Sequence, residues 1–444
     1  MKDLKNLSLK SKLKFLKENY NSFYFSGYDI KVLKKQIKIA LFYECGDFSF
    51  SHKLTFYFPE NLDVKKTDIE ILAKHLGIIE GLNYWKSFCS ENIILKNINL
   101  NKKQINFWNK VILKGMFQYF YENKINPFGG VNIKIIADNK ESNEIIKNNF
   151  LPYRFLVAMG GGKDSIVSFE LTKKLVEEKF KKDTSEIFLF SVNPTKIIED
   201  VVKTTGDKNF IRVKREIDKR VLELNKTGFL NGHIPFTGIL SFISLVPAIV
   251  LKAKNIVFSA EKSASECNVV WHNLEINHQW SKTREFQNLF RQYIKDILPD
   301  VDYINYFDNT LEFDIAKLFS LYPKYFKVFS SCNNQFKITE NKSKIRWCCE
   351  CPKCLFVFII LYPFLEYHDI ISIFGEDLFE KKSFKNIFDG LIGLENKPFE
   401  CVGTYKEIQK ALNLCLDKIE KESKKLPYLI SYYKNLKYNK SSKI

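Results

Sequence analysis

Apolar and polar residues alternate along the first part of the chain. The alternation runs through Tyr28–Tyr43 and Phe48–Phe58, on either side of Gly46. A period of two that is interrupted by a Gly-containing turn is typical of a β-hairpin. Helical periodicity follows over Asp68–Phe88 and Asn106–Asn123. These patterns predict a β-rich segment that also contains helices.

From Leu151 onward, short apolar runs alternate with helical stretches. The runs that predict strands are Phe155–Met159, Ile187–Val192, Phe210–Val213 and Asn255–Ser259. The stretches that predict helices are Asp164–Lys182, Lys196–Thr205, Lys214–Asn225 and Pro235–Lys254. Strands separated by crossover helices indicate a parallel sheet with right-handed connections. Such a sheet binds ligands at the carboxyl ends of its strands.

The polar run Asp138–Asn149 is the best candidate for a linker between these two parts. We therefore predict three units in an α/β protein. Residues 1–148 form a β-rich α+β N-terminal module, and residues 149–370 form an α/β domain with a parallel sheet. Residues 371–444 form a helical C-terminal region, whose Lys- and Ser-rich end we expect to fray.

Composition places the chain among ordinary globular proteins, because its 444 residues are 45% hydrophobic and 27% charged. This balance excludes an intrinsically disordered protein. The formal net charge is +18 and comes mostly from Lys spread along the whole chain. Since no single predicted face collects this charge, we expect no nucleic-acid partner. A basic cleft would suit a polyanionic small substrate such as a nucleotide sugar.

The apolar stretches of the chain are too short to span a membrane. The longest, Thr237–Leu251 and Cys354–Leu365, each contain a Pro and fall below the roughly 20 residues that a span needs. We expect both to be buried helices. The segment Met1–Lys17 alternates Lys with Leu and shows no secretory signal. Ten Cys without an export signal favour a cytoplasmic setting and a metal site over disulfides.

A glycine-rich segment joins the first predicted strand of the α/β part to its first helix. It contains three glycines in a row, Gly160, Gly161 and Gly162. Their backbone can approach a ligand closely, and the N–H groups at the helix N-terminus form a site for phosphate. Lys163 adds a positive charge, and the Ser165 hydroxyl can reach a phosphate oxygen. Asp164 can either cap the helix or hold Mg²⁺.

The segment Gly161–Ser165 resembles the Gly-Gly-x-Asp-Ser core of the PP-loop ATP pyrophosphatases, with Gly160 in place of the Ser that usually precedes it. The resemblance implies an adenine nucleotide α-hydrolase-like fold. It also implies that ATP is split into AMP and diphosphate, commonly by adenylation of a carboxylate or carbonyl oxygen. In that fold the adenine lies near the end of the second strand, which here is Asn193.

Five of the ten Cys crowd into the segment between residues 332 and 354. Cys348, Cys351 and Cys354 have Cys-x-x-Cys-x-x-Cys spacing, and Cys332 lies upstream of them. Four thiolates can close a tetrahedral Zn²⁺ site, to which we assign a folding role and no chemistry. Cys349 is the spare thiol, and the sequence leaves open whether it replaces Cys348 as a ligand. The arrangement resembles the zinc site of the deazaguanine-synthase branch of the PP-loop enzymes.

A polar segment follows the fourth predicted strand, where an α/β domain places its ligand site. It runs from Ser259 to Trp280 and holds three acids, two His, one Cys and two Trp. Acid/base and stacking groups at this position indicate a catalytic role. The candidates for proton transfer are His278, His272, Glu261 and Cys267, with Cys401 behind them.

Several short motifs follow the glycine-rich segment in order: Asn231–Pro235, Ser259–Glu261, Asn268–His272, Asn277–Lys282, Trp347–Cys354 and Lys397–Gly403. Together they resemble the UDP-N-acetylmuramoyl-L-alanyl-L-glutamate epimerase family of bacterial cell-wall biosynthesis. The similarity spans most of the chain, and the N-terminal module matches more loosely. One departure is Cys349-Glu350, where the family is expected to have Gly and a variable residue.

This resemblance implies an epimerase that uses ATP and Mg²⁺ to convert the terminal L-Glu of UDP-N-acetylmuramoyl-L-alanyl-L-glutamate to D-Glu. Removing the α-proton beside an ionised carboxylate would build a second negative charge, and adenylation of that carboxylate removes the first. Because alanine acylates the glutamate nitrogen, the activated species can also close to an oxazolone. Either the open adenylate or the oxazolone is then deprotonated.

Three other interpretations compete with this one. A PP-loop enzyme that modifies a tRNA base or a deazaguanine precursor would fit the charge and the cysteines, but it calls for a catalytic thiol pair or an RNA-binding annex. A zinc-stabilised nucleic-acid-binding protein would make no use of the Gly160–Ser165 segment. An ATP-dependent ligase would share the adenylate and add an amine acceptor.

Overall fold

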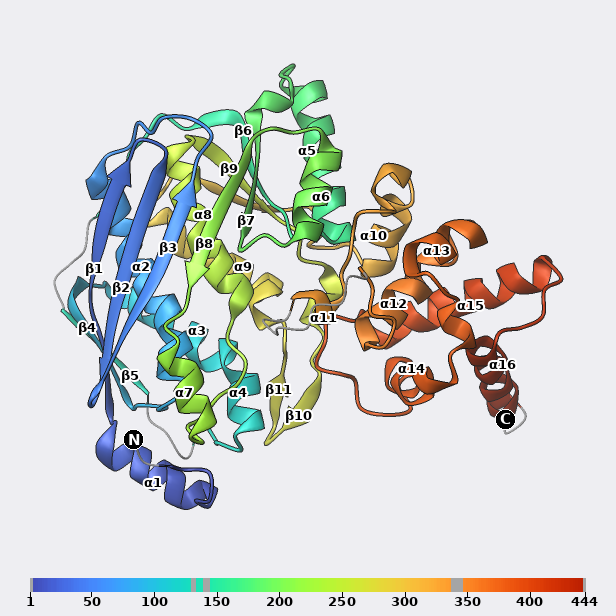
Figure 1. The fold of residues 1–444 in the computed structure, drawn as a ribbon, viewed down its shortest axis with the longest axis horizontal. Helices are drawn as coiled ribbons and strands as arrows, with labels where there is room; N and C mark the ends of the chain where they lie inside the picture. Colours follow the sequence, from blue (N-terminus) through green and yellow to red (C-terminus); the bar gives the residue numbers. More distant parts are fainter. Residues whose placement is uncertain (1–2, 129–132, 139–143, 337–345, 442–444) are drawn as a thin grey trace.

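The computed structural model describes residues 3–128, 133–138, 144–336 and 346–441 (Figure 1). Ten strands form one sheet: β1 (Ser22–Leu33), β2 (Gln36–Cys45), β3 (Phe48–Tyr57), β4 (Asn92–Asn99), β5 (Lys134–Asp138), β6 (Leu151–Ala158), β7 (Ile187–Val192), β8 (Phe210–Glu216), β9 (Ala253–Phe258) and β12 (Asp302–Asn305). Their order across the sheet is β12-β9-β6-β7-β8-β3-β2-β1-β4-β5. A separate small hairpin consists of β10 (Val269–Trp271) and β11 (Leu274–Ile276).

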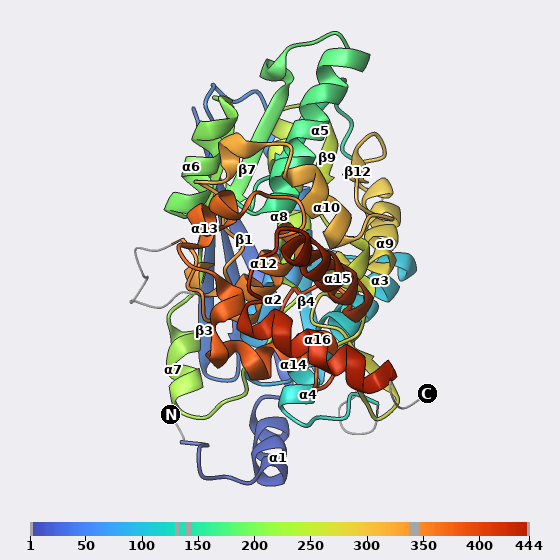
Figure 2. The same ribbon diagram turned by 90° about the vertical axis from the view of Figure 1, so that its right-hand side faces the viewer.

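Helices cover the sheet and extend beyond it. Those of the first half are α1 (Leu9–Asn19), α2 (Lys66–Trp85), α3 (Lys102–Gly115), α4 (Phe117–Glu122), α5 (Lys163–Lys179), α6 (Lys196–Thr205) and α7 (Arg220–Lys226). Those of the second half are α8 (Phe236–Val250), α9 (Arg284–Lys295), α10 (Glu312–Phe319), α11 (Asn333–Phe336), α12 (Pro352–Leu361), α13 (Tyr367–Phe374), α14 (Lys385–Ile392), α15 (Tyr405–Lys421) and α16 (Tyr428–Ser441). The helices from α12 onward gather at one end of the molecule, which faces the viewer in Figure 2. The predicted α/β fold with a helical C-terminal region is confirmed.

The N-terminal strands form two successive hairpins. β2 and β3 pair antiparallel with Cys45 opposite Phe48, and Gly46 in their turn has a φ of +55°. Gly takes this left-handed conformation without the steric cost that a Cβ brings. The predicted hairpin is therefore confirmed at this turn. The predicted strand Tyr28–Tyr43 contains a second turn, because β1 and β2 are separate strands that pair antiparallel.

The N-terminal strands and the parallel strands belong to the same sheet. β3 pairs antiparallel with β8, with Thr55 opposite Lys214. This pairing extends β8 to Glu216, so the predicted helix Lys214–Asn225 is wrong at its start, and α7 begins at Arg220. The extension depends on a partner strand far away in the sequence, which local periodicity cannot reveal.

The parallel half of the sheet positions the site. β12, β9, β6, β7 and β8 run parallel to one another. The chain passes from β6 to β7 and β8 in one direction and then returns to β9 on the other side of β6. This reversal opens a crevice at the carboxyl ends of β6 and β9, where open α/β sheets bind ligands. The predicted strand Ile187–Val192 and helix Lys196–Thr205 coincide with β7 and α6.

Alternate residues of β6 point into two separate cores. Leu156 packs in the core that contains α8 and the N-terminal strands, whereas Phe155 and Val157 pack with α5, α6 and the C-terminal helices. The period of two of a strand produces this division. The two apolar stretches expected to be buried helices correspond to α8 and α12, one in each core. Within the described ranges, no helix is both long and apolar enough to cross a bilayer.

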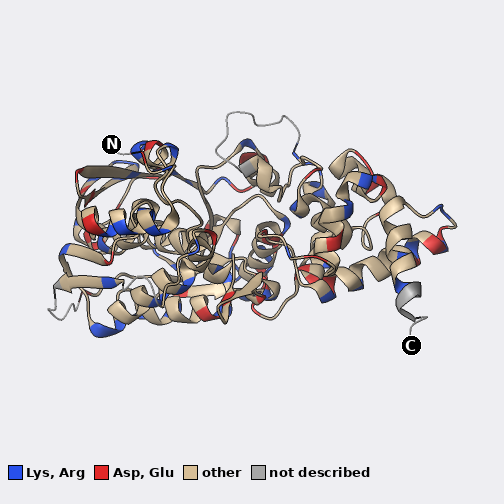
Figure 3. Cartoon of the chain, turned by 90° about the horizontal axis from the view of Figure 1, so that it is seen from below, with Lys and Arg blue, Asp and Glu red and all other residues tan. Residues whose placement is uncertain are grey.

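Charged side chains of both signs are distributed along the molecule. In the view of Figure 3, basic and acidic positions occur on the sheet and on the C-terminal helices alike. Many form exposed ion pairs, such as Lys96 with Glu44 and Lys434 with Glu420. Such pairs contribute little to stability because solvent screens them.

The contact of α2 with β1 gives a first prediction. A Cβ added at Gly77 would lie 1.9 Å from Cζ of the buried Phe25 ring. Gly77→Ala should therefore destabilise the protein by about 1–3 kcal/mol through overpacking, although Ala in a helix interior normally gains about 0.5–1 kcal/mol. Denaturant unfolding measures the change. Phe25→Leu in the same chain should offset part of the loss, and a Gly77→Ala protein more stable than the parent would contradict this packing.

Candidate functional site

A cavity of about 480 Å³ lies at the carboxyl ends of the parallel strands. One wall consists of residues that follow β6, β7 and β9 directly, among them Met159, Gly160, Asn193 and Ser259. The facing wall comes from later parts of the chain and includes Lys282, Glu312, Ser330, Ser331, Lys353 and Cys401. The strand topology therefore produces a ligand-sized cavity at the expected edge of the sheet.

The glycine-rich segment leads from β6 into α5 as the sequence predicts. Gly161 has a φ of +79°, and its carbonyl oxygen accepts a hydrogen bond from Ser330 N at 3.1 Å. Gly162 precedes the first turn of α5, and Ser165 Oγ donates to its carbonyl oxygen at 3.0 Å. A Cβ at Gly162 would lie 2.6 Å from Ser331 Oγ. The loop thus brings Gly160, Gly162 and Ser165 to the cavity, and Ser331 lies against Gly162 from the facing wall.

Lys163 lies at the start of α5 and contacts two carboxylates. Its ammonium is fully buried and lies 2.5 Å from Asp164 Oδ1 and 3.3 Å from Glu312 Oε1. Burial disfavours the charged form, but the two carboxylates outweigh it and hold the pKa of Lys163 above its usual value. The charge of Lys163 is thus shared with two acids inside the protein. Gly160, Gly162, Asp164 and Ser165 line the cavity.

Glu312 binds a second buried lysine. Lys353 Nζ lies 2.9 Å from Glu312 Oε1, and Gly403 N donates to Glu312 Oε2 at 3.3 Å. Burial raises the pKa of Glu312, but Lys163 and Lys353 outweigh it and lower that pKa to about 2. A carboxylate between two ammonium groups therefore joins α5, α10 and α12 beneath the cavity.

None of the four sequence-predicted acid/base candidates is among the residues that line the cavity. Glu261 is buried, its pKa is raised by burial, and its Oε1 lies 3.8 Å from Lys282 Nζ. His278 Nδ1 lies 2.6 Å from Gln118 Oε1, and burial followed by the charge of Lys282 lowers the His278 pKa to about 4. His278 also packs against His233, with ring centroids 4.5 Å apart.

The other two candidates lie on or beside the β10–β11 hairpin. His272 is exposed in the turn of this hairpin, with a φ of +48° and its ring against Trp271. Cys267 precedes β10 and is half-buried, and burial followed by Glu275 raises its pKa. The cavity wall contains neither residue.

The end of β7 places Asn193 and Thr195 at the cavity. The Asn193 side chain donates to Arg215 O and accepts from Arg215 N, both at 2.8 Å, so its amide braces β7 against β8. Thr195 Oγ1 is buried and has no hydrogen-bond partner among the described residues. A buried hydroxyl without a partner is costly, which indicates a position that a ligand satisfies.

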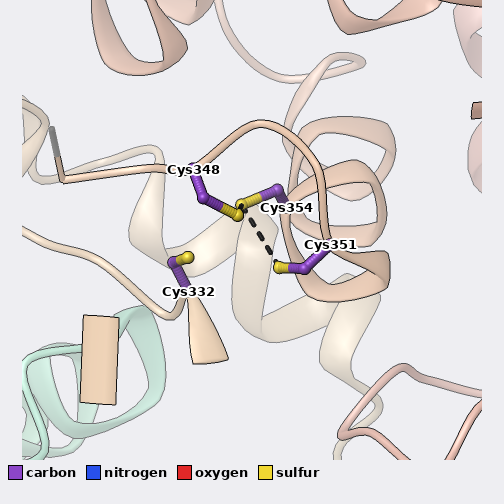
Figure 4. A group of neighbouring side chains, drawn as sticks. All are labelled: Cys332, Cys348, Cys351 and Cys354. Atoms are coloured by element: carbon purple, nitrogen blue, oxygen red, sulfur yellow. Dashed lines mark hydrogen bonds between the residues drawn. The ribbon is translucent and has the colours of Figure 1, made fainter. Parts of the chain in front are cut away.

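Four cysteines meet beside the cavity (Figure 4). The Sγ atoms of Cys332, Cys348, Cys351 and Cys354 all lie within 4.8 Å of one another. Cys348 Sγ is 3.7 Å and Cys351 Sγ is 3.5 Å from Cys354 Sγ. Thiolates at about 2.3 Å from a tetrahedral Zn²⁺ would be about 3.8 Å apart, so the cluster has the dimensions of a zinc site.

Cys349 faces away from this cluster. Its Sγ lies 3.2 Å from Phe374 O and burial raises its pKa. Its φ of +52° falls in the left-handed region that favours Gly. This backbone conformation gives a physical reason for the Gly that the family resemblance leads us to expect at this position.

The chain matches family models over most of its length. The family model described as the MurL N-terminal domain matches residues 14–307, and the model described as the MurL C-terminal domain matches residues 328–439. The chain belongs to the MurL family. No solved structure matches this chain.

Curated MurL relatives resemble the chain over most of their length. A protein of Micromonospora sp. is 32% identical over 373 residues, which cover 83% of this chain and 80% of the relative. A protein of Salinispora tropica is 32% identical over 392 residues, which cover 87% and 83%. A protein of Xanthomonas oryzae pv. oryzae is 29% identical over 356 residues, which cover 80% and 76%. All three carry the name UDP-N-acetyl-alpha-D-muramoyl-L-alanyl-L-glutamate epimerase.

Sequence reasoning missed several residues of the cavity of this MurL-family chain. Lys282 and Lys353 lie within recognised motifs, but Glu312 lies on a helix that shows only ordinary periodicity. Arg215 was placed in a helix, although it lies on β8 and binds Glu80 of α2, with Nη2 2.6 Å from Oε2. The signal that the sequence offers for Glu312 is its charge at a position that shares one helical face with Ile315, Ala316 and Phe319.

The Glu312 contact gives a second prediction. Glu312→Gln keeps the shape of the side chain but leaves two buried ammonium groups without their shared carboxylate, so the free energy of unfolding should fall by about 3–5 kcal/mol. Asp314→Asn removes a half-exposed charge, which pairs only loosely with Lys410, from the same helix and should change it by less than about 0.5 kcal/mol. Urea unfolding of both variants compares them. An equal effect of the two substitutions would contradict the buried role of Glu312.

Proposed function

We propose that this MurL-family protein is an ATP-dependent epimerase that converts the terminal L-Glu of UDP-N-acetylmuramoyl-L-alanyl-L-glutamate to D-Glu. The observation that carries the proposal is the match, over most of both chains, to relatives named as this epimerase. The substrate is a UDP-linked precursor of peptidoglycan, so we place the reaction in the cytoplasm. The +18 net charge suits a substrate with several anionic groups.

The cavity fits a nucleotide as co-substrate. The N-terminus of α5 and the backbone of Gly160 and Gly162 supply phosphate-binding N–H groups. The unpartnered hydroxyl of Thr195 supports a ligand at the end of β7, where the fold resemblance puts the adenine of ATP. Because the Asn193 amide is engaged with Arg215, we infer that Asn193 contacts the nucleotide through its backbone. Asp164 lines the cavity and would hold Mg²⁺, which neutralises phosphate charge.

Activation of the α-carboxylate explains why an epimerase of this substrate would use ATP. An ionised carboxylate makes the neighbouring α-proton very weakly acidic, and adenylation removes that negative charge. AMP and diphosphate are then the products of ATP, and hydrolysis of the activated group restores the acid. The acylated nitrogen also permits closure to an oxazolone, which we retain as a second form of the activated substrate.

Inversion needs proton removal on one face of the α-carbon and proton delivery on the other. We propose that the two proton-transfer groups come from the candidates His278, His272, Glu261 and Cys267, with Cys401 behind them. His278 is neutral near pH 7, because its pKa is lowered to about 4, and can accept a proton. Glu261, whose pKa is raised by burial, retains a proton more readily than an exposed carboxyl and can deliver one.

We further propose that Cys332, Cys348, Cys351 and Cys354 hold a structural Zn²⁺. The distances between their sulfur atoms support this assignment. The metal would fix the segment from Ser330 to Asn333, which lines the cavity.

We keep the division into units 1–148, 149–370 and 371–444 as a proposal for how the chain is organised.

A third prediction tests the reaction directly. In D₂O with ATP and Mg²⁺, the protein should convert the UDP-muramoyl L-Ala-L-Glu substrate to the D-Glu product with deuterium at Cα, and release AMP. Without ATP, Cα should gain no deuterium. Asp164→Asn should slow AMP formation at least about tenfold through the lost carboxylate, whereas half-exposed Asp314→Asn should not. Cα exchange without ATP would overturn the activation mechanism, and formation of ADP would exclude adenylation.

A fourth prediction tests the metal. The purified protein should contain one Zn²⁺ per chain by elemental mass spectrometry. Cys354→Ser should lose the metal and lower the unfolding midpoint, because binding free energy of a structural zinc is folding free energy. Cys349→Ser should keep it, since Cys349 Sγ points to Phe374 O. Loss of zinc from Cys349→Ser, with retention in Cys348→Ser, would reassign the ligands.

A further inference from the structure

A lysine and a cysteine meet at the wall of the cavity. Lys282 Nζ lies 3.5 Å from Cys401 Sγ, and both residues line the cavity. Lys282 is the last residue of the short helical turn Trp280–Lys282, and Cys401 lies in the segment before α15. Two distant parts of the chain thus bring a potential nucleophile and a cation into contact beside the glycine-rich loop.

The surroundings keep Lys282 charged. Burial disfavours its ammonium, but Cys401 and Glu261 outweigh burial and hold the pKa of Lys282 above its usual value. An ammonium group in contact with a thiol stabilises the thiolate, which is the reactive form. The other charged groups that face this pair are Glu261, Asp164, Glu312 and Lys353.

Contacts also connect Cys401 to the phosphate loop. The Cys401 carbonyl oxygen accepts a hydrogen bond from Lys353, which binds Glu312, which in turn binds Lys163 at the start of α5. Cys401 lines the same cavity as Gly160 and Gly162 of the loop, so a carboxylate bound at the loop would share that cavity with the Cys401 side chain. The side chain is half-buried, so it is accessible from the cavity.

We propose that Cys401 is the acid/base group that exchanges the α-proton on one face of the activated glutamyl residue, and that Lys282 holds it as the thiolate. The proposal rests on the function proposed above. In this step the sulfur takes the proton, so the S–H bond forms as the Cα–H bond breaks. The electron pair moves to the carbonyl oxygen and gives an enolate. A second acid then protonates the other face, and the S–H proton exchanges with solvent.

The first test separates activation from proton exchange. Cys401→Ser should form AMP from ATP and substrate at a rate within about threefold of the parent, but incorporate deuterium at Cα about 10²–10⁴-fold more slowly, the usual range for loss of a positioned base. Cys45→Ser makes the same change at a buried position on β2 and should leave both rates unchanged. Exchange within tenfold of the parent, or an equal loss of AMP formation and exchange, would overturn the role of Cys401.

The second test addresses Lys282 without using the reaction. Peptide mass spectrometry should show that iodoacetamide modifies Cys401 faster at pH 7 in the parent than in Lys282→Gln, by at least about tenfold, with the difference disappearing at pH 10, where thiols ionise unaided. Equal modification rates at pH 7 would reject the thiolate pair. A parent protein that forms no AMP would instead reject the proposed function, while this modification test would still decide on the pair.

Discussion

The carboxylate of Glu312 lies between the ammonium groups of Lys163 and Lys353, and the two walls of the cavity depend on that contact. All three side chains are buried, where an uncompensated charge costs several kcal/mol. The residues come from α10, α5 and α12, so the charges are balanced only when these helices are docked together. The phosphate loop and the C-terminal helices are therefore held in one arrangement by electrostatics as well as by apolar packing.

The contact between Glu312 and Lys353 also links the cysteine cluster to the cavity. Lys353 lies between Cys351 and Cys354, and Ser330 and Ser331 precede Cys332 while they line the cavity. Ser330 N also binds Gly161 O of the loop. A displacement of the cluster would thus move Lys353 and the two serines together. The cluster therefore bears on the geometry of this wall of the cavity.

How much the sequence predicts depends on the range of the interactions involved. β7, α6 and the turn at Gly46 follow from local periodicity and from backbone conformation, and all were predicted. The extension of β8 was not, because pairing with β3 decides it. Glu312 and Lys353 were missed for the same reason, since each is significant only through partners on other helices. Motif reasoning located the glycine-rich loop because its chemistry resides in consecutive residues.

The cavity is complete only when both MurL domains are present. The stretch matched by the N-terminal domain supplies the loop Gly160–Ser165 and Lys282, whereas the stretch matched by the C-terminal domain supplies Lys353 and Cys401. Further contacts cross the same boundary, such as that of Asn268 Nδ2 with Pro398 O at 3.1 Å. The fold therefore places the glycine-rich loop and Lys282 on one domain and Cys401, which contacts Lys282, on the other. A ligand held in this cavity would therefore contact residues of both domains.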